Sequence, residues 1–197
     1  MKKIALFGGT FNPVHNGHIN LLKSIDEKFG FDEILLIPSH IPPHKDAKDL
    51  ASGKSRMKML SFAFEDIEKC GVCDIELNKK GKSYTIDTVK KLKQIFPQDE
   101  LYFIIGSDML FTFDKWKNWR EILKYTNILA SLRNDGETEA LIKKAEELDK
   151  NRIKVVVTEP FSVSSTEVRD MIKSGKDVSH LVPEKVLRYI NLEGLYR

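Results

Sequence analysis

The sequence predicts an α/β protein with a Rossmann-like, doubly wound parallel sheet of about six strands and helices on both faces. Short apolar runs alternate with segments of helical periodicity along the chain, an order typical of parallel sheets. Most of these runs are apolar at every position, as expected of strands that helices cover on both faces. The chain has 197 residues, 41% hydrophobic and 31% charged, and is expected to form a single domain over residues 1–197.

The expected strands lie at 4–7, 34–37, 72–77, 101–105, 127–132 and 153–157. Apolar residues three or four positions apart predict helices between them. The first three helix faces are Ile19, Leu22, Ile25 and Phe29; Met57, Leu60, Phe64 and Ile67; and Ile86, Val89, Leu92 and Phe96. The last helix is expected to begin with Pro183 at its first position and to run toward Gly194.

Composition argues against several classes of protein. The net charge is only +3 and acidic residues are interleaved with basic ones, so no nucleic-acid partner is expected. No apolar segment approaches the roughly 18 to 20 residues of a membrane span, and we expect a cytoplasmic monomer or homodimer without a membrane partner.

The two cysteines form a Cys-x-x-Cys pair, Cys70 and Cys73. We expect Cys70 at a helix C-terminus, Gly71 as a left-handed stop and Cys73 entering a strand. Redox pairs sit instead at helix N-termini, and a zinc site would need two further ligands, so a functional pair is disfavoured.

The most informative segment is Gly-Gly-Thr-Phe-Asn-Pro-Val-His-Asn-Gly-His at 8–18. It follows the first expected strand and opens the first expected helix, where backbone N–H groups favour anions. His15 and His18 add imidazole donors, so the segment is suited to a polyphosphate. It matches neither the Walker loop nor Gly-x-Gly-x-x-Gly. The alternative is a tight turn with a capping histidine.

A second segment, Ser-Ser-Thr-Glu-Val-Arg at 164–169, is expected to open another helix. Ser164 and Glu167 have the spacing of a capping box, and a cap alone is the alternative interpretation. The hydroxyl groups and Arg169 one turn later are also suited to a triphosphate. Because both segments follow strands at the same edge of the sheet, we expect them to share one ligand.

Together these motifs resemble the nucleotidyltransferase superfamily and, within it, the nicotinate-nucleotide adenylyltransferases. The resemblance extends to Pro-Ser-His-Ile-Pro-Pro-His-Lys at 38–45, Ser-Tyr-Thr at 83–85, Gly-Ser-Asp at 106–108, Trp116 followed by Trp119, and the ending at 189–196. It implies that the 5′-phosphate of nicotinate mononucleotide attacks the α-phosphorus of ATP, which yields deamido-NAD and pyrophosphate. Mg²⁺ is expected to arrive with ATP, and no metal held by the protein is expected.

The resemblance also implies roles for individual residues. Its catalytic residues are His15, His18 and Arg169. Its ATP-binding residues are Gly8, Thr10, Phe11, Gly106, Asp108, Ser164, Ser165 and Thr166. Its residues for the second substrate are Lys45, Thr85, Trp116, Lys117 and Arg133. Position 117 is often aromatic in the family, and Lys117 departs from that pattern with a charge that can attract a carboxylate.

Three alternatives stay open. The acceptor could be nicotinamide mononucleotide or another phosphorylated molecule, and the chain could bind ATP as a sensor without turnover. A zinc site could use His15-x-x-His18 and His40-x-x-x-His44, although Pro42-Pro43 prevents the second pair from sharing a helix face.

Overall fold

The structure, a computed structural model, describes residues 1–40, 49–78, 83–132, 137–158 and 163–197. Within these ranges a six-stranded parallel sheet has the order β3-β2-β1-β4-β5-β6. Its strands are β1 (Lys3–Gly9), β2 (Glu33–Pro38), β3 (Cys70–Val72), β4 (Glu100–Gly106), β5 (Asn127–Leu132) and β6 (Ile153–Val157). The strand order reverses between β1 and β4, so the predicted doubly wound fold is confirmed.

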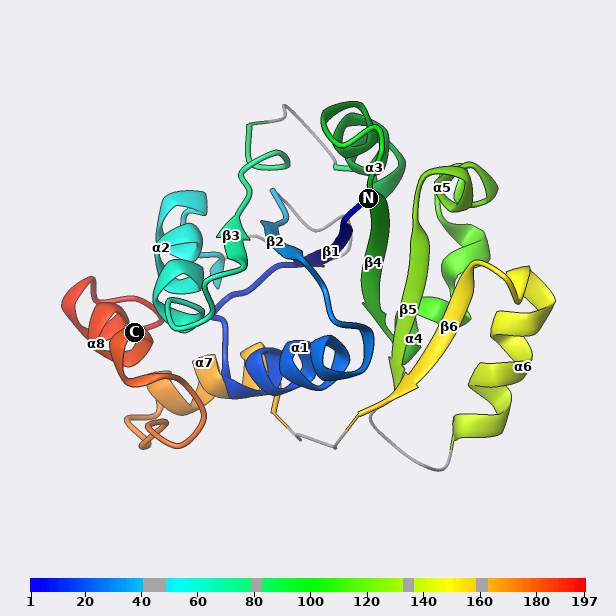
Figure 1. Ribbon diagram of the computed structural model, residues 1–197. Helices are drawn as coiled ribbons and strands as arrows, with labels where there is room; N and C mark the ends of the chain where they lie inside the picture. Colours follow the sequence, from blue (N-terminus) through cyan, green and yellow to red (C-terminus); the bar gives the residue numbers. More distant parts are fainter. Residues whose placement is uncertain (41–48, 79–82, 133–136, 159–162) are drawn as a thin grey trace.

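Helices cover both faces of the sheet (Figure 1). One layer contains α1 (Asn16–Phe29), α2 (Gly53–Ala63), α7 (Ser165–Lys173) and α8 (Glu184–Leu192). The other contains α3 (Thr85–Ile95), α4 (Ser107–Phe111), the short 3₁₀ helix η2 (Phe113–Lys115), α5 (Trp119–Tyr125) and α6 (Thr138–Asp149).

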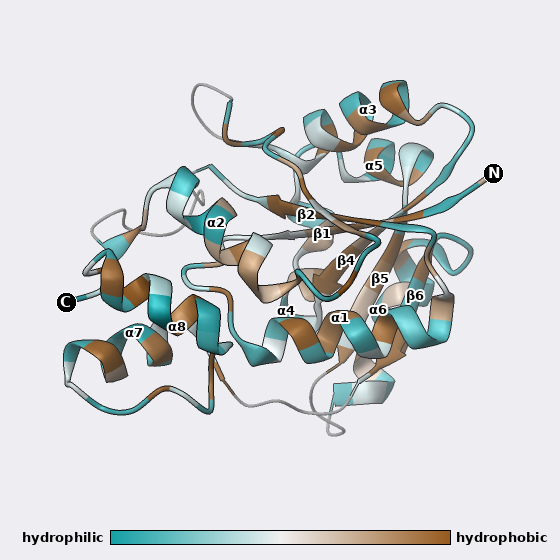
Figure 2. Cartoon of the chain, turned by 60° about the vertical axis from the view of Figure 1, so that its left-hand side comes forward, coloured by the Kyte–Doolittle hydropathy of each residue, from teal (hydrophilic) through white to brown (hydrophobic). Residues whose placement is uncertain are grey.

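Strand β1 shows why the runs are uniformly apolar. Ala5 and Phe7 belong to the core under α1, whereas Ile4 and Leu6 belong to the core under α3, and each is at most 5% exposed. Full burial of a large aliphatic or aromatic side chain contributes about 1.5–3 kcal/mol, so both faces of the strand stabilise the fold. Figure 2 shows the same arrangement, with hydrophobic strands inside and helices whose polar surfaces face outward.

The third strand differs from its prediction. It spans Cys70–Val72 rather than 72–77, and α2 ends at Ala63, so Cys70 and Gly71 lie in a strand and not at a helix end. Gly71 pairs with Leu35 of β2. Ile75 lies in a turn and its side chain is buried. Apolar residues alone do not show whether such a buried segment is a strand or a turn.

Both cysteines are half-buried free thiols. Burial raises the pKa of Cys70 to about 11 and raises the pKa of Cys73 as well. The thiols are therefore protonated at neutral pH, the opposite of a reactive redox pair.

At the last helix, Pro183 is the N-cap and Glu184 the first helical residue, one position later than predicted. Proline still fits there because its missing N–H would have no partner within the helix in any case.

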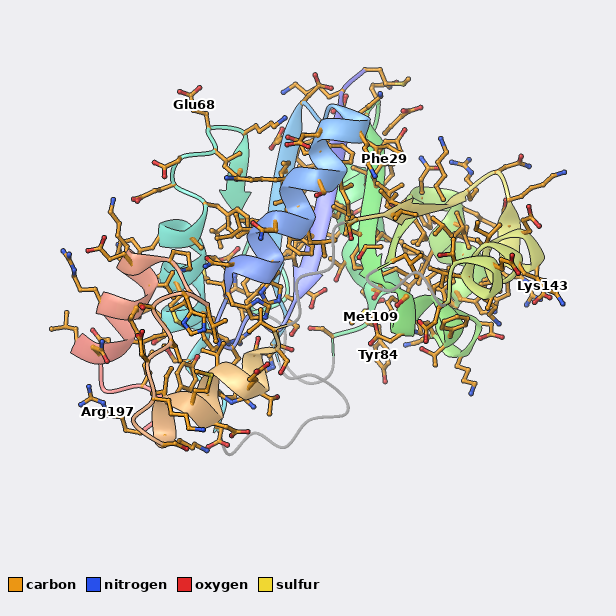
Figure 3. The ribbon with its side chains drawn as sticks, turned by 90° about the horizontal axis from the view of Figure 1, so that it is seen from below. Phe29, Glu68, Tyr84, Met109, Lys143 and Arg197 are labelled. Atoms are coloured by element: carbon orange, nitrogen blue, oxygen red, sulfur yellow. The ribbon has the colours of Figure 1, made fainter. Side chains whose placement is uncertain are left out.

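The two edges of the sheet are distinct in Figure 3. Phe29 and Glu68, which precede β2 and β3, lie at one end of the molecule, and Tyr84 and Met109 lie toward the other. The second end is the carboxyl edge, where ligands of doubly wound sheets bind. None of the helices in the described ranges has the length and apolar character needed to cross a membrane.

Candidate functional site

The turn between β1 and α1 brings two imidazole rings together. His15 is the N-cap of α1 in an extended conformation and is 3% exposed, and His18 lies one turn later with its ring centroid 3.7 Å from that of His15. The backbone N–H of His15 donates to Nδ1 of His18 over 3.2 Å. Because Nδ1 accepts this bond, a neutral His18 carries its proton on Nε2, which is thereby a donor.

The ring of Phe11 packs against the imidazole of His18. Phe11 has a left-handed backbone (φ 49°), is 1% exposed, and its ring meets those of Phe7 and His18 edge-on at 5.4 and 5.0 Å between centroids. Phe11, which we expected to bind the nucleotide, therefore has its side chain in the core and in contact with His18. Gly8 is also constrained by packing, because a Cβ there would lie 3.1 Å from Cζ of Phe103.

The start of α7 touches the same turn. Ser164 caps α7 by accepting a hydrogen bond from the Glu167 N–H at 3.1 Å, half of the expected capping box. Arg169 donates from Nη1 to the carbonyl of Asn12 at 2.9 Å, across 157 positions of sequence. The Ser165 hydroxyl donates to the carbonyl of Pro13 at 2.9 Å. The structure thus brings the first and second motifs into direct contact.

Thr166 lies in the first turn of α7. Its hydroxyl accepts from Nη2 of Arg169 at 3.3 Å. Nε of Arg169 is buried and has no hydrogen-bond partner among the described residues. One donor of the guanidinium is therefore left to be satisfied.

Sequence reasoning did not single out Asn12, although it lies inside the first motif. It is 5% exposed, and its carboxamide oxygen accepts from the Tyr196 hydroxyl at 2.7 Å and from the Ala51 N–H at 3.0 Å. Its amide nitrogen donates to the carbonyl of Asp49 at 2.8 Å. An Asn-Pro pair usually indicates only a turn, so no local signal predicted these distant partners.

Arg56 of α2 was also missed. It is 2% exposed, and its guanidinium donates to the backbone carbonyls of Thr10, Ser39, His40 and Ala51. Burial lowers the pKa of this guanidinium. The described residues show no carboxylate in an ion pair with it. Thr10, expected to bind ATP, is therefore held through its carbonyl.

At the end of β4, Gly106 caps α4 and Asp108 lies exposed in its first turn. A Cβ on Gly106 would lie 2.5 Å from Oδ1 of Asp108. The missing side chain at Gly106 is thus what allows the carboxylate to occupy its position.

Two segments that carry expected residues for the second substrate, one with Thr85 and one with Trp116 and Lys117, contact each other. Thr85 is the first residue of α3, after Tyr84 as N-cap. Trp116 follows η2, half-buried, with its ring 5.2 Å from that of Phe113. Lys117 places Nζ 4.3 Å from the centroid of the Tyr84 ring, which links the two segments. Lys45 and Arg133 lie outside the described residues.

The described ranges contain no group of three or more His, Cys, Asp or Glu side chains arranged to hold a metal ion. His44 lies outside them.

Comparison with known proteins gives this arrangement a family. The family model described as "Cytidylyltransferase-like" matches residues 6–171. The nicotinate-nucleotide adenylyltransferase of Bacillus subtilis is 37% identical over 100% of this chain and 99% of its own length. The chain belongs to the nicotinate-nucleotide adenylyltransferases of the cytidylyltransferase-like family.

Other relatives of these adenylyltransferases agree. A Clostridium tetani protein named "Probable nicotinate-nucleotide adenylyltransferase" is 38% identical over the full length of both chains. The Plasmodium falciparum nicotinic acid mononucleotide adenylyltransferase complexed with NaAD has the same fold, with a TM-score of 0.82 at 20% identity over 100% of this chain and 98% of that one. The resemblance stated from the motifs is confirmed at the level of the family.

Proposed function

We propose that this chain transfers the adenylyl group of ATP to nicotinate mononucleotide, which forms deamido-NAD and releases pyrophosphate. The observation that carries the proposal is the bond from Arg169 to the Asn12 carbonyl, because it places the guanidinium of α7 on the turn that holds His15 and His18. The B. subtilis relative, which carries the corresponding name over its full length, supports the same activity.

The triphosphate of ATP would bind between the starts of α1 and α7. Helix N-termini favour anions, and Ser164, Ser165 and Thr166 place hydroxyl groups at the start of α7. A phosphate oxygen would complete the hydrogen bonding of Arg169, whose Nε lacks a partner among the described residues. A guanidinium is suited to this role because it donates to phosphate in a fixed planar geometry.

The chemical step needs orientation and charge stabilisation rather than a nucleophilic side chain. A 5′-phosphate oxygen of nicotinate mononucleotide forms a bond to the α-phosphorus of ATP. The bond from that phosphorus to the oxygen bridging to the β-phosphate breaks, and pyrophosphate leaves with the electron pair. The Nε2–H of His18, whose Nδ1 is occupied by the backbone of His15, is the donor we assign to the transferred phosphoryl group.

Mg²⁺ would bind mainly to phosphate oxygens and water. Asp108 fits such an ion because it offers an exposed carboxylate oxygen, the ligand type that Mg²⁺ prefers, at the end of β4. Held mainly by the phosphates and close to Asp108, the ion would neutralise part of the phosphate charge.

The pyridine ring of the second substrate would lie near Thr85 and Trp116, with the indole as a stacking surface. Lys117 would attract the carboxylate of nicotinate, because its ammonium group is held over the Tyr84 ring next to Thr85. An amide in the same position carries no charge and would gain nothing from Lys117.

The test is pyrophosphate release by purified protein with Mg²⁺ and ATP, and separately nicotinate mononucleotide, nicotinamide mononucleotide or phosphopantetheine. We expect the fastest release with nicotinate mononucleotide. Faster release with nicotinamide mononucleotide would overturn the acceptor, and release with phosphopantetheine alone would place the chain with another transferase. No release at all, with tight ATP binding, would leave a sensor.

A further inference from the structure

The residues that follow α8 turn back into the protein. Gly194 and Tyr196 have left-handed backbones (φ 61° and 63°), and the Leu195 N–H donates to the carbonyl of Ile190 at 3.0 Å. Tyr196 is 9% exposed and belongs to the core cluster that also contains the buried residues of α1, α2, α7 and α8. The proposed chemistry gives this tyrosine no role.

Tyr196 reaches the phosphate-binding turn through a single bond. Its hydroxyl donates to Oδ1 of Asn12 at 2.7 Å, across 184 positions of sequence. Burial raises the pKa of Tyr196, so the phenol keeps the proton that this bond requires at any working pH. The positive charges of Arg169 and Arg56 oppose this rise in the pKa of Tyr196 without outweighing the effect of burial.

Asn12 links Tyr196 to Arg169, because it is hydrogen-bonded to both. The side chain of Asn12 is held by Tyr196, Ala51 and Asp49, and its backbone carbonyl accepts from Nη1 of Arg169. Rotation of the Asn12 side chain would break three hydrogen bonds, two of them buried, and these bonds restrain the backbone carbonyl that orients Arg169. The geometry therefore relates Tyr196 to Arg169 through one residue.

We propose that Tyr196 is a positioning residue that, through Asn12, holds Arg169 in the orientation needed to bind the triphosphate of ATP. The proposal rests on the proposed function for its kinetic tests, but not for its binding test. Tyr196 does not touch substrate in this proposal, and removal of its hydroxyl changes catalysis only through the guanidinium.

The test variant is Tyr196→Phe, which removes the hydroxyl and keeps the ring. We expect kcat/KM for ATP to fall about three- to tenfold, the range of one lost buried hydrogen bond, with KM for nicotinate mononucleotide changed less than about twofold. Tyr102→Phe is the matched control. Tyr102 is also 9% exposed, and its hydroxyl donates to Glu100 at 2.9 Å at the opposite edge of the sheet. This control should lose stability and keep both Michaelis constants.

A double-mutant cycle separates positioning from a general loss of stability. In an Arg169→Lys background, which keeps the charge but not the planar fork, Tyr196→Phe should cost less than about twofold, because its route to the triphosphate is already broken. Effects that multiply in the double variant, or a Tyr196→Phe enzyme with unchanged kinetics and a lowered melting temperature, would overturn the proposal.

Binding of MgATP, measured by calorimetry without acceptor, keeps the two proposals apart. The dissociation constant of Tyr196→Phe should rise about three- to tenfold over that of the unaltered protein, whether or not adenylyl transfer occurs. An unaltered protein that binds MgATP but transfers nothing would overturn the proposed function alone. An equal dissociation constant in Tyr196→Phe would overturn the role of Tyr196 alone.

Discussion

Replacement of His18 by alanine is expected to lower kcat by about 10² to 10³. The structure leaves Nδ1 of His18 bound to the His15 N–H, so alanine removes one Nε2–H donor assigned to the transferred phosphoryl group. A donor directed at charge that develops in the transition state contributes roughly 3 to 4 kcal/mol, which corresponds to this loss of rate. An interaction made mainly in the transition state lowers kcat with little change in KM.

Two amide side chains distinguish the nitrogen atoms of His18. The amide nitrogen of glutamine reaches approximately the position of Nε2, whereas that of asparagine reaches only the position of Nδ1. We expect His18→Gln to recover about tenfold of the rate lost in His18→Ala, and His18→Asn to stay as slow as alanine. The assay is pyrophosphate release at saturating ATP and nicotinate mononucleotide, with urea unfolding as a measure of stability.

His180→Ala is the matched control for these variants. His180 is exposed and contacts Asn16 of α1 through its backbone carbonyl rather than its ring, so kcat should be unchanged. A His18→Ala enzyme within tenfold of the unaltered rate would remove His18 from the mechanism. Equal rates for the glutamine and asparagine variants would refute Nε2 as the donor.

Four further predictions follow from particular contacts. Gly106→Ala places a Cβ 2.5 Å from Oδ1 of Asp108, so the carboxylate must move, and KM for MgATP should rise about three- to tenfold. Gly71→Ala, whose Cβ meets no atom within 4 Å, should leave KM for MgATP unchanged. Equal effects of the two substitutions would exclude Asp108 from ATP binding. Lys117→Gln should lower kcat/KM for nicotinate mononucleotide up to about fivefold at low salt, and less at high salt, without changing kcat/KM for nicotinamide mononucleotide. The exposed Lys124→Gln is the control and should change neither value. An equal loss with both acceptors would exclude a charge interaction between Lys117 and the carboxylate. Arg56→Lys should lower the free energy of unfolding in urea by about 2 to 4 kcal/mol, because the single ammonium group of lysine cannot reach all four carbonyls and leaves some of them unpaired. The exposed Arg120→Lys should change this free energy by less than about 0.5 kcal/mol. A similarly small change for Arg56→Lys would contradict the hydrogen bonds of Arg56. Iodoacetamide should label Cys70 about 100-fold more slowly at pH 8 than an unperturbed thiol, and the rate should rise as pH approaches the raised pKa of about 11. Because the folded pKa of Cys70 lies above the unfolded one, the contribution of this thiol to stability is complete below the unfolded pKa and is lost as pH rises toward 11. Rapid labelling at pH 8 would contradict the burial of the thiol.

Most of the fold could be predicted because the strands of a covered parallel sheet have an unmistakable pattern. The run at 101–105 lies within β4, and the run at 127–132 coincides with β5. The apolar side chains of both strands pack into the core on one face of the sheet or the other. The edge strand β3 was misplaced because it has three residues and includes Gly71, so hydrogen bonds to β2 rather than apolar periodicity define it.

The candidate site was predictable where a local pattern carried the signal. Ser164 caps a helix as its spacing predicts, and His18 follows a strand and a tight turn. Phe11 shows the limit of that approach, since its side chain supports an imidazole from the core and the sequence alone could not tell which way the ring points. Asn12 was not singled out because its partners come from segments far away in the sequence, which no spacing rule connects.

Arg56 connects separate backbone segments at the carboxyl edge of the sheet. Its side chain donates to the backbone at the end of β1, at the end of β2 and before α2, so a shift of one of these segments relative to the others would cost hydrogen bonds to Arg56. The backbone of the first motif is therefore tied to β2 and α2 by a residue that lies outside both motifs.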